Sequence, residues 1–173
     1  MMYTAKNFDT LLGTAGFSDR LLKNHFTLYQ GYVTQTNKVA ELMMSMVKEG
    51  KANLPEFAEL KRRFGWEFNG MRLHELYFGN MKKGGMTLNQ NSPFAKAILT
   101  QMGSLETFEK AFKAVGSMRG IGWVVLAYDT EGKRFFNLWI NEHDVGHLTG
   151  TVPLLIMDDF EHAYMVDYDT KKG

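Results

Sequence analysis

The chain has 173 residues, 45% of them hydrophobic, so it is long enough to build a substantial core without disulfides. Its 20 basic and 19 acidic residues nearly balance, which argues against nucleic acid or an anionic membrane as a partner. The absence of cysteine excludes disulfides, thiolate zinc sites and iron–sulfur clusters. We find no apolar run of about 18 residues and no signal-peptide pattern, so we expect a soluble, cytoplasmic protein with no membrane partner.

Two long helices are predicted in the first half of the chain. Ser18 can cap a helix from Asp19 to about Gly50, because apolar residues recur there at intervals of three and four. Pro55 suits the first turn of a second helix, which continues an apolar stripe to about Met81. Because only a short loop joins them, the pattern predicts a long antiparallel helical hairpin.

A polar, glycine-rich segment, Lys82–Asn91, follows the hairpin and shows no hydrophobic period. Turn-forming residues without such a period are typical of a boundary between two parts of a chain. We therefore expect an N-terminal helical-hairpin domain at residues 1–84 and a C-terminal domain at residues 92–173.

The second half of the chain combines helical and strand-like patterns. Two short helices are predicted first, at residues 93–102 and 105–115. Three apolar runs of strand length follow, at residues 123–128, 134–140 and 152–157. The predicted fold class is α+β, with a long antiparallel α-hairpin followed by an α/β domain that holds a small three-stranded antiparallel sheet.

Four residues in apolar surroundings form a candidate ligand set for one first-row transition metal. The set consists of three imidazoles and one carboxylate, His25, His74, Asp158 and His162. A single histidine on the apolar stripe of a helix can also be a hydrogen-bonded core residue, and an Asp–His pair can be purely structural. From the residues alone, both interpretations stay open.

The run Asp158-Asp-Phe-Glu-His162-Ala-Tyr164 resembles the C-terminal signature of the iron/manganese superoxide dismutase family, D-x-W-E-H-A-Y. The resemblance continues in residues 32–38, 68–78 and 120–123. It implies that the four candidate residues bind one iron ion, or manganese as the alternative, and that the substrate is superoxide. Neutral imidazoles with a hard carboxylate suit either metal.

The resemblance also assigns residues around the metal, and it leaves two choices open. Tyr32 matches the family's gateway tyrosine, but it follows His25 by seven residues where eight are usual, so Tyr29 is the alternative. His143 matches a residue that contacts the solvent molecule on the metal, and His147 could take its place. A histidine there is more typical of iron-dependent or metal-tolerant members, which favours iron over manganese.

Further residues receive expected roles from the same resemblance. Trp123 and Phe160 should lie beside the metal, although Phe160 replaces the usual tryptophan. Glu161 and Tyr164 fall where the family builds its dimer contact, which implies a homodimer or tetramer. Lys172 falls near the substrate funnel, where a cation would steer an anion.

Three departures from the family pattern leave a second function open, and the first is the shifted spacing of Tyr32. Members usually continue through a further C-terminal helix, which this sequence lacks after Gly173, and the aromatic at Phe160 has lost an indole donor. The alternative is therefore a non-catalytic metal-binding or interaction protein on the same scaffold. A hydrolytic zinc enzyme fits less well, because catalytic zinc usually keeps its fourth position for water.

Overall fold

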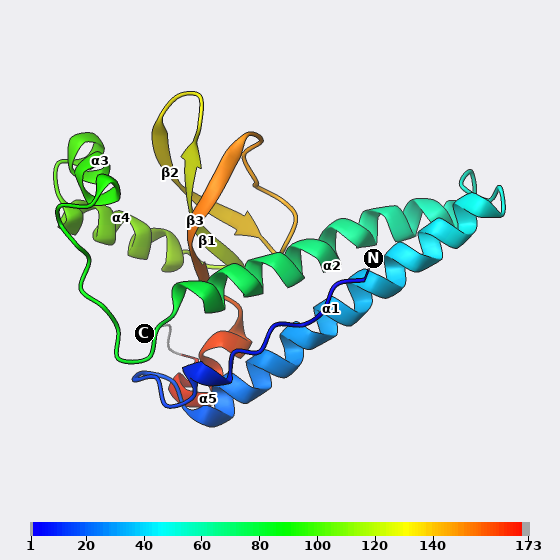
Figure 1. The fold of residues 1–173 in the computed structure, drawn as a ribbon, viewed down its shortest axis with the longest axis horizontal. Helices are drawn as coiled ribbons and strands as arrows, with labels where there is room; N and C mark the ends of the chain where they lie inside the picture. The colour runs from blue at the N-terminus through cyan, green and yellow to red at the C-terminus, as the bar shows by residue number, and fades with distance from the viewer. Residues whose placement is uncertain (1, 171–173) are drawn as a thin grey trace.

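The computed structural model describes residues 2–170 and divides them into a helical hairpin, a sheet and a pair of short helices (Figure 1). The helices and strands, in chain order, are η1 (Asp9–Leu11), α1 (Asp19–Lys48), α2 (Pro55–Asn80), α3 (Pro93–Met102), α4 (Leu105–Gly116), β1 (Gly122–Asp129), β2 (Arg134–Asn141), β3 (Thr151–Asp158), η2 (Glu161–Ala163) and α5 (Met165–Tyr168). This arrangement confirms the predicted α+β class.

The two long helices begin and end where the capping residues place them. Ser18 accepts a hydrogen bond from the backbone N–H of Leu21 at 3.1 Å, which satisfies one of the free donors at the start of α1. Pro55 occupies the first turn of α2, where its missing N–H is not needed. The chain leaves α1 through Gly50, whose φ of +69° is readily adopted by glycine.

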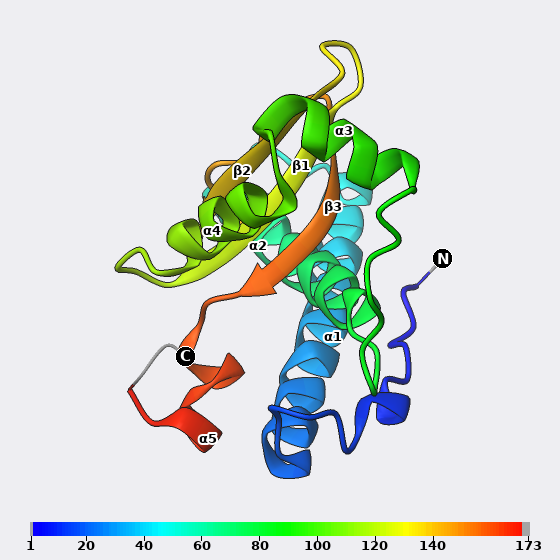
Figure 2. The same ribbon diagram turned by 90° about the vertical axis from the view of Figure 1, so that its left-hand side faces the viewer.

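The sheet has the strand order β2-β1-β3, with both pairs antiparallel, and it lies between α2 and the α3–α4 pair (Figure 2). The central strand β1 is therefore buried on both faces. Trp123 and Val125 pack into the core shared with the hairpin, whereas Val124 and Leu126 pack into the core shared with α3 and α4. This position explains why β1 reads as an almost continuous apolar run.

Hydrogen bonds of one side chain at the end of α2 fix the hairpin against the sheet, and strand pairing fixes the end of β3. The side chain of Asn80, the last residue of α2, donates to the carbonyl of Leu154 at 3.1 Å and accepts from the N–H of Ile156 at 3.0 Å. Trp123 on β1 pairs with Asp158 at the end of β3. The carboxylate that ends β3 is thereby held at a fixed place beside α2.

The chain returns to the start of α1 after β3. The hydroxyl of Tyr168 donates to the carbonyl of Gly16 at 2.6 Å, and Asp167 accepts from the N–H of Ser18 at 2.6 Å. Within residues 2–170, none of the helices is long and apolar enough to cross a membrane. The division into domains at residues 1–84 and 92–173 stays a prediction.

We predict that Gly70→Ala destabilises the protein, because the added Cβ would lie 2.6 Å from the ring of Tyr32. Overpacking of this kind costs about 1–3 kcal/mol. Gly79→Ala on the same helix is the matched control, since its Cβ would meet no atom within 4 Å among the described residues. The control should gain up to about 1 kcal/mol from helix propensity. Urea unfolding of both variants tests this, and equal stabilities would contradict the packing argument.

Candidate metal centre

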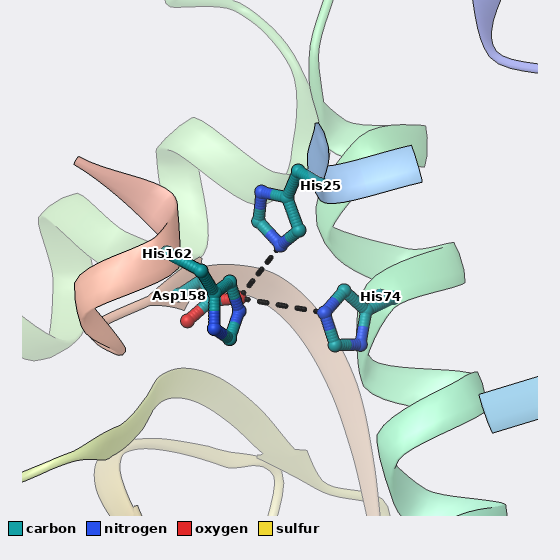
Figure 3. Close-up of side chains that lie close together, drawn as sticks. All are labelled: His25, His74, Asp158 and His162. Carbon is teal, nitrogen blue, oxygen red and sulfur yellow. Dashed lines mark hydrogen bonds and ion pairs between the residues drawn. The ribbon is translucent and has the colours of Figure 1, made fainter. Parts of the chain in front are cut away.

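Four side chains from four different elements converge on one point (Figure 3). His25 comes from α1, His74 from α2, Asp158 from the end of β3 and His162 from η2. Each offers one ligand atom, and these atoms lie within 4.8 Å of one another. The four predicted ligands are therefore brought together, and the site joins the hairpin to the sheet.

One carboxylate oxygen lies at the centre of the cluster. Oδ2 of Asp158 lies 3.1 Å from Nε2 of His25, 3.1 Å from Nε2 of His162 and 3.7 Å from Nε2 of His74. The side chains of Asp158, His25 and His74 are fully buried, whereas that of His162 is 28% exposed. Solvent therefore reaches the cluster beside His162.

The protonation of His74 shows that the cluster suits a cation. Its Nδ1 lies 2.6 Å from the carbonyl oxygen of Gly70, which can only accept, so Nδ1 carries the proton. Nε2 of the neutral ring then has no proton and is a hydrogen-bond acceptor. It is buried without a hydrogen-bond partner among residues 2–170. A buried acceptor facing a carboxylate is unfavourable unless a cation lies between them. A metal ion would satisfy both atoms.

The charge state of the site follows from its burial. Burial lowers the pKa of His25 and lowers that of His74 to about 3, so both rings are neutral at pH 7. Burial opposes ionisation of Asp158, but its hydrogen bonds with His162 and His25 outweigh burial and lower the pKa of the carboxyl group. Neutral imidazoles beside a carboxylate are the protonation states that a first-row metal requires of its ligands.

A hydrogen-bonded chain of Trp123, His143 and Tyr32 lies against the cluster. The indole Nε1 of Trp123 donates to Nδ1 of His143 at 3.0 Å, and Nε2 of His143 lies 2.7 Å from the hydroxyl of Tyr32. Phe160 stacks on His143 with ring centroids 4.9 Å apart, and on His162 at 5.2 Å. These aromatic residues connect the buried His143 to a candidate ligand.

The two alternative residues have hydrogen-bond partners outside the cluster. Tyr29 donates its hydroxyl to Oε1 of Glu75 at 3.0 Å, whereas the ring of Tyr32 lies 5.2 Å from that of His74. Seven residues are about 20° short of two helical turns, so His25 and Tyr32 share one face of a regular helix. His147 is exposed, and its Nε2 donates to the carbonyl of His143 at 2.9 Å. The roles of Tyr32 and His143 remain predictions.

The residues expected at the dimer contact lie on η2 and directly after it. Glu161 is exposed, and Tyr164 lies beside a cavity of about 390 Å³ that is also lined by Asp159 and Tyr77. Their place in a dimer contact stays a prediction. Lys172 lies outside the described residues.

Sequence reasoning missed two residues that shape the site. Trp66 meets the ring of His143 edge-on at 4.7 Å, and Gly70 both accepts from His74 and leaves room for Tyr32. Both precede His74 on α2, by eight and by four residues, and so lie near its face of the helix. This helical spacing from His74 is the sequence pattern that could have indicated both residues.

Comparison with known proteins gives the family. Residues 90–173 match the family model described as iron/manganese superoxide dismutases, C-terminal domain. An iron superoxide dismutase of Aquifex pyrophilus is 34% identical over 91% of this chain and 75% of its own length. An iron enzyme of Sulfolobus acidocaldarius is 30% identical over 84% and 70%, and a manganese enzyme of Haloferax volcanii is 31% identical over 87% and 73%. The chain belongs to the iron/manganese superoxide dismutase family.

Proposed function

We propose that this protein is a superoxide dismutase in which His25, His74, Asp158 and His162 hold one iron ion, with manganese as the alternative. The observation that carries the proposal is the bare, buried Nε2 of His74, which faces a carboxylate at 3.7 Å and needs a cation. When bound, the metal exchanges one electron between its +2 and +3 states, so one superoxide is oxidised to dioxygen and another, taking two protons, is reduced to hydrogen peroxide.

His143 supports iron, because a histidine at this place is more typical of iron-dependent or metal-tolerant members. Its ring is fully buried between Trp123, Tyr32 and Phe160. The names of the relatives include both metals, which agrees with a ligand set that suits either one.

Tyr32 and His143 are the proposed proton carriers. Since Nδ1 of His143 accepts from Trp123, the neutral ring carries its proton on Nε2 and donates it to the oxygen of Tyr32. The hydroxyl proton of Tyr32 is then left for another acceptor. Burial, with the charges of Glu67 and Asp158, raises the pKa of Tyr32 to about 12, so the hydroxyl keeps this proton at pH 7. Tyr32 is the proposed donor to the forming peroxide.

We also propose that the protein works in the cytoplasm as a homodimer or tetramer, with domains at residues 1–84 and 92–173. The partly exposed His162 supports association, because a ligand that its own chain leaves open to solvent would be covered by a partner. Glu161 is its exposed neighbour, and we propose it as part of the contact.

The proposed activity predicts metal content and dismutation that depend on the same residues. The purified protein should hold about one iron or manganese ion and remove superoxide. His162→Ala should lower metal affinity by more than about 100-fold, because loss of a ligand exceeds the 10–100-fold cost of losing an outer hydrogen bond. His147→Ala, at an exposed histidine, is the control and should keep both properties. Elemental analysis and a superoxide assay measure them.

Three results of that experiment separate the possibilities. A protein that takes up neither metal would refute the proposed function. Bound metal without dismutation would favour the non-catalytic alternative. Equal metal content and activity in His162→Ala would remove His162 from the ligand set.

His143 predicts how stability depends on pH. Burial lowers its pKa to about 4 from 6.5, so between these values the unfolded state binds a proton that the native state does not. Stability is therefore lost as the pH falls through this window. Between pH 7 and pH 5, the free energy of unfolding of the metal-free His143→Gln variant should fall by about 2 kcal/mol less than that of the unsubstituted protein. This difference follows from 1.36 kcal/mol per pH unit.

Urea unfolding at the two pH values measures this difference. His147→Gln makes the same substitution at an exposed position of the same loop and should behave like the unsubstituted protein. Parallel losses in His143→Gln and the unsubstituted protein would mean that His143 is not held neutral.

The proposed assembly predicts a mass of about twice 19.8 kDa, or four times for a tetramer, in sedimentation velocity. Glu161→Lys should weaken association at least about tenfold if Glu161 lies in the contact, because it reverses a charge there. Glu131→Lys, in the exposed β1–β2 turn, is the control. A monomer at all concentrations would contradict the proposed assembly.

A further inference from the structure

A buried carboxylate directly follows a proposed ligand on α2. Glu75 is 7% exposed, and it receives three side chains. The hydroxyl of Tyr29 donates to Oε1 at 3.0 Å, Nη1 of Arg72 donates to Oε2 at 2.6 Å, and Nζ of Lys6 lies 3.2 Å from Oε2. Two of the three partners are cations, and both oxygens are engaged.

The contact with Tyr29 crosses between the two helices at the level of the metal site. Tyr29 is fully buried and follows His25 by one helical turn. Its ring centroid lies 6.3 Å from that of His74. Its hydroxyl donates to Glu75, the residue after His74. One hydrogen bond therefore connects the ligand-bearing turns of α1 and α2.

The N-terminal strap, residues 2–8, adds a third element to this contact and runs alongside α1 (Figure 1). The N–H of Lys6 donates to the hydroxyl of Tyr29 at 3.0 Å, in addition to the ion pair of its side chain with Glu75. Further along the strap, the backbone N–H and carbonyl of Tyr3 both bond to the side chain of Asn37, each at 2.8 Å. The strap thus contacts both helices around Glu75.

A metal site needs the helical register that this network can supply. Sliding one helix by one residue would move its ligand by about 1.5 Å, whereas metal–ligand distances tolerate about 0.2 Å. Apolar packing between helices adapts to small shifts, but hydrogen bonds are directional and are costly to break when buried. The network around Glu75 is therefore suited to hold His25 and His74 in register.

We propose that Glu75 is a positioning residue for the metal: through Tyr29 and the N-terminal strap, it holds α1 and α2 in the register that lets His25 and His74 bind one ion. This inference rests on the proposed metal site. It assigns a function to Tyr29, which is not the residue that we propose as the gateway tyrosine, and to the strap. Glu75 acts on His25 and His74 through Tyr29 and the strap.

The test uses Glu75→Gln and Tyr29→Phe in the iron-loaded protein of residues 1–173. Glu75→Gln removes the charge that Arg72 and Lys6 face, and Tyr29→Phe removes one hydroxyl while keeping the ring. Glu59→Gln is the matched control, because Glu59 lies on the same helix in an exposed pair with Arg62. The measurements are the rate of iron release to a chelator and the electron paramagnetic resonance spectrum of the ferric protein.

We expect iron release about tenfold faster in Glu75→Gln, and faster by a smaller factor in Tyr29→Phe, as for other residues that orient metal ligands. Both should change the ferric spectrum, whereas Glu59→Gln should leave rate and spectrum unaltered. Circular dichroism and urea unfolding identify any variant that fails to fold. If Glu75→Gln does not fold, iron release and the ferric spectrum of Tyr29→Phe test the proposal instead.

Two outcomes overturn the inference and differ from each other. Lower stability in both variants, with unchanged iron release and spectrum, would mean that Glu75 is merely structural. An unsubstituted protein that binds no iron or manganese would refute the proposed function, and the inference with it.

Discussion

Oδ2 of Asp158 is the atom on which the rest of the structure depends. It is buried with imidazole nitrogens of His25, His162 and His74 around it, at 3.1, 3.1 and 3.7 Å. Removing a charge from water costs several kcal/mol, so this carboxylate must be matched by donors or by a cation. Because its partners come from α1, α2 and η2, matching that one charge brings together segments that are far apart in the chain.

The same few residues build the core and set the chemistry. Trp123 is fully buried in the core shared by the hairpin and the sheet, pairs with Asp158 across the strands, and donates to His143. Phe160 stacks on both His143 and His162. A rigid core therefore fixes the orientation of the groups that would handle protons, which is how a site keeps its geometry without strain in the ligands.

The sequence predicts what local patterns determine. The hairpin, the sheet and the four ligand positions follow from apolar periodicity, capping residues and one motif, and the structure brings the predicted ligands together. The choice between His143 and His147 could not be made in that way, because it depends on a loop in which Glu142 adopts a left-handed φ of +52°. Glu75 was missed for a related reason. A glutamate on a helix is expected at the surface. Tyr29, which donates to it, is 46 residues away in the sequence, so no local pattern links the two.

The contact between Asn80 and β3 has a consequence for self-association. β3 is an edge strand, and an unpaired edge offers a template on which another chain can add a strand. The side-chain amide of Asn80 donates to the carbonyl of Leu154 and accepts from the N–H of Ile156. Pro153 has no backbone N–H to donate. On the strand that carries Asp158, Asn80 therefore leaves fewer free backbone groups for another chain to pair with, in addition to fixing the position of β3.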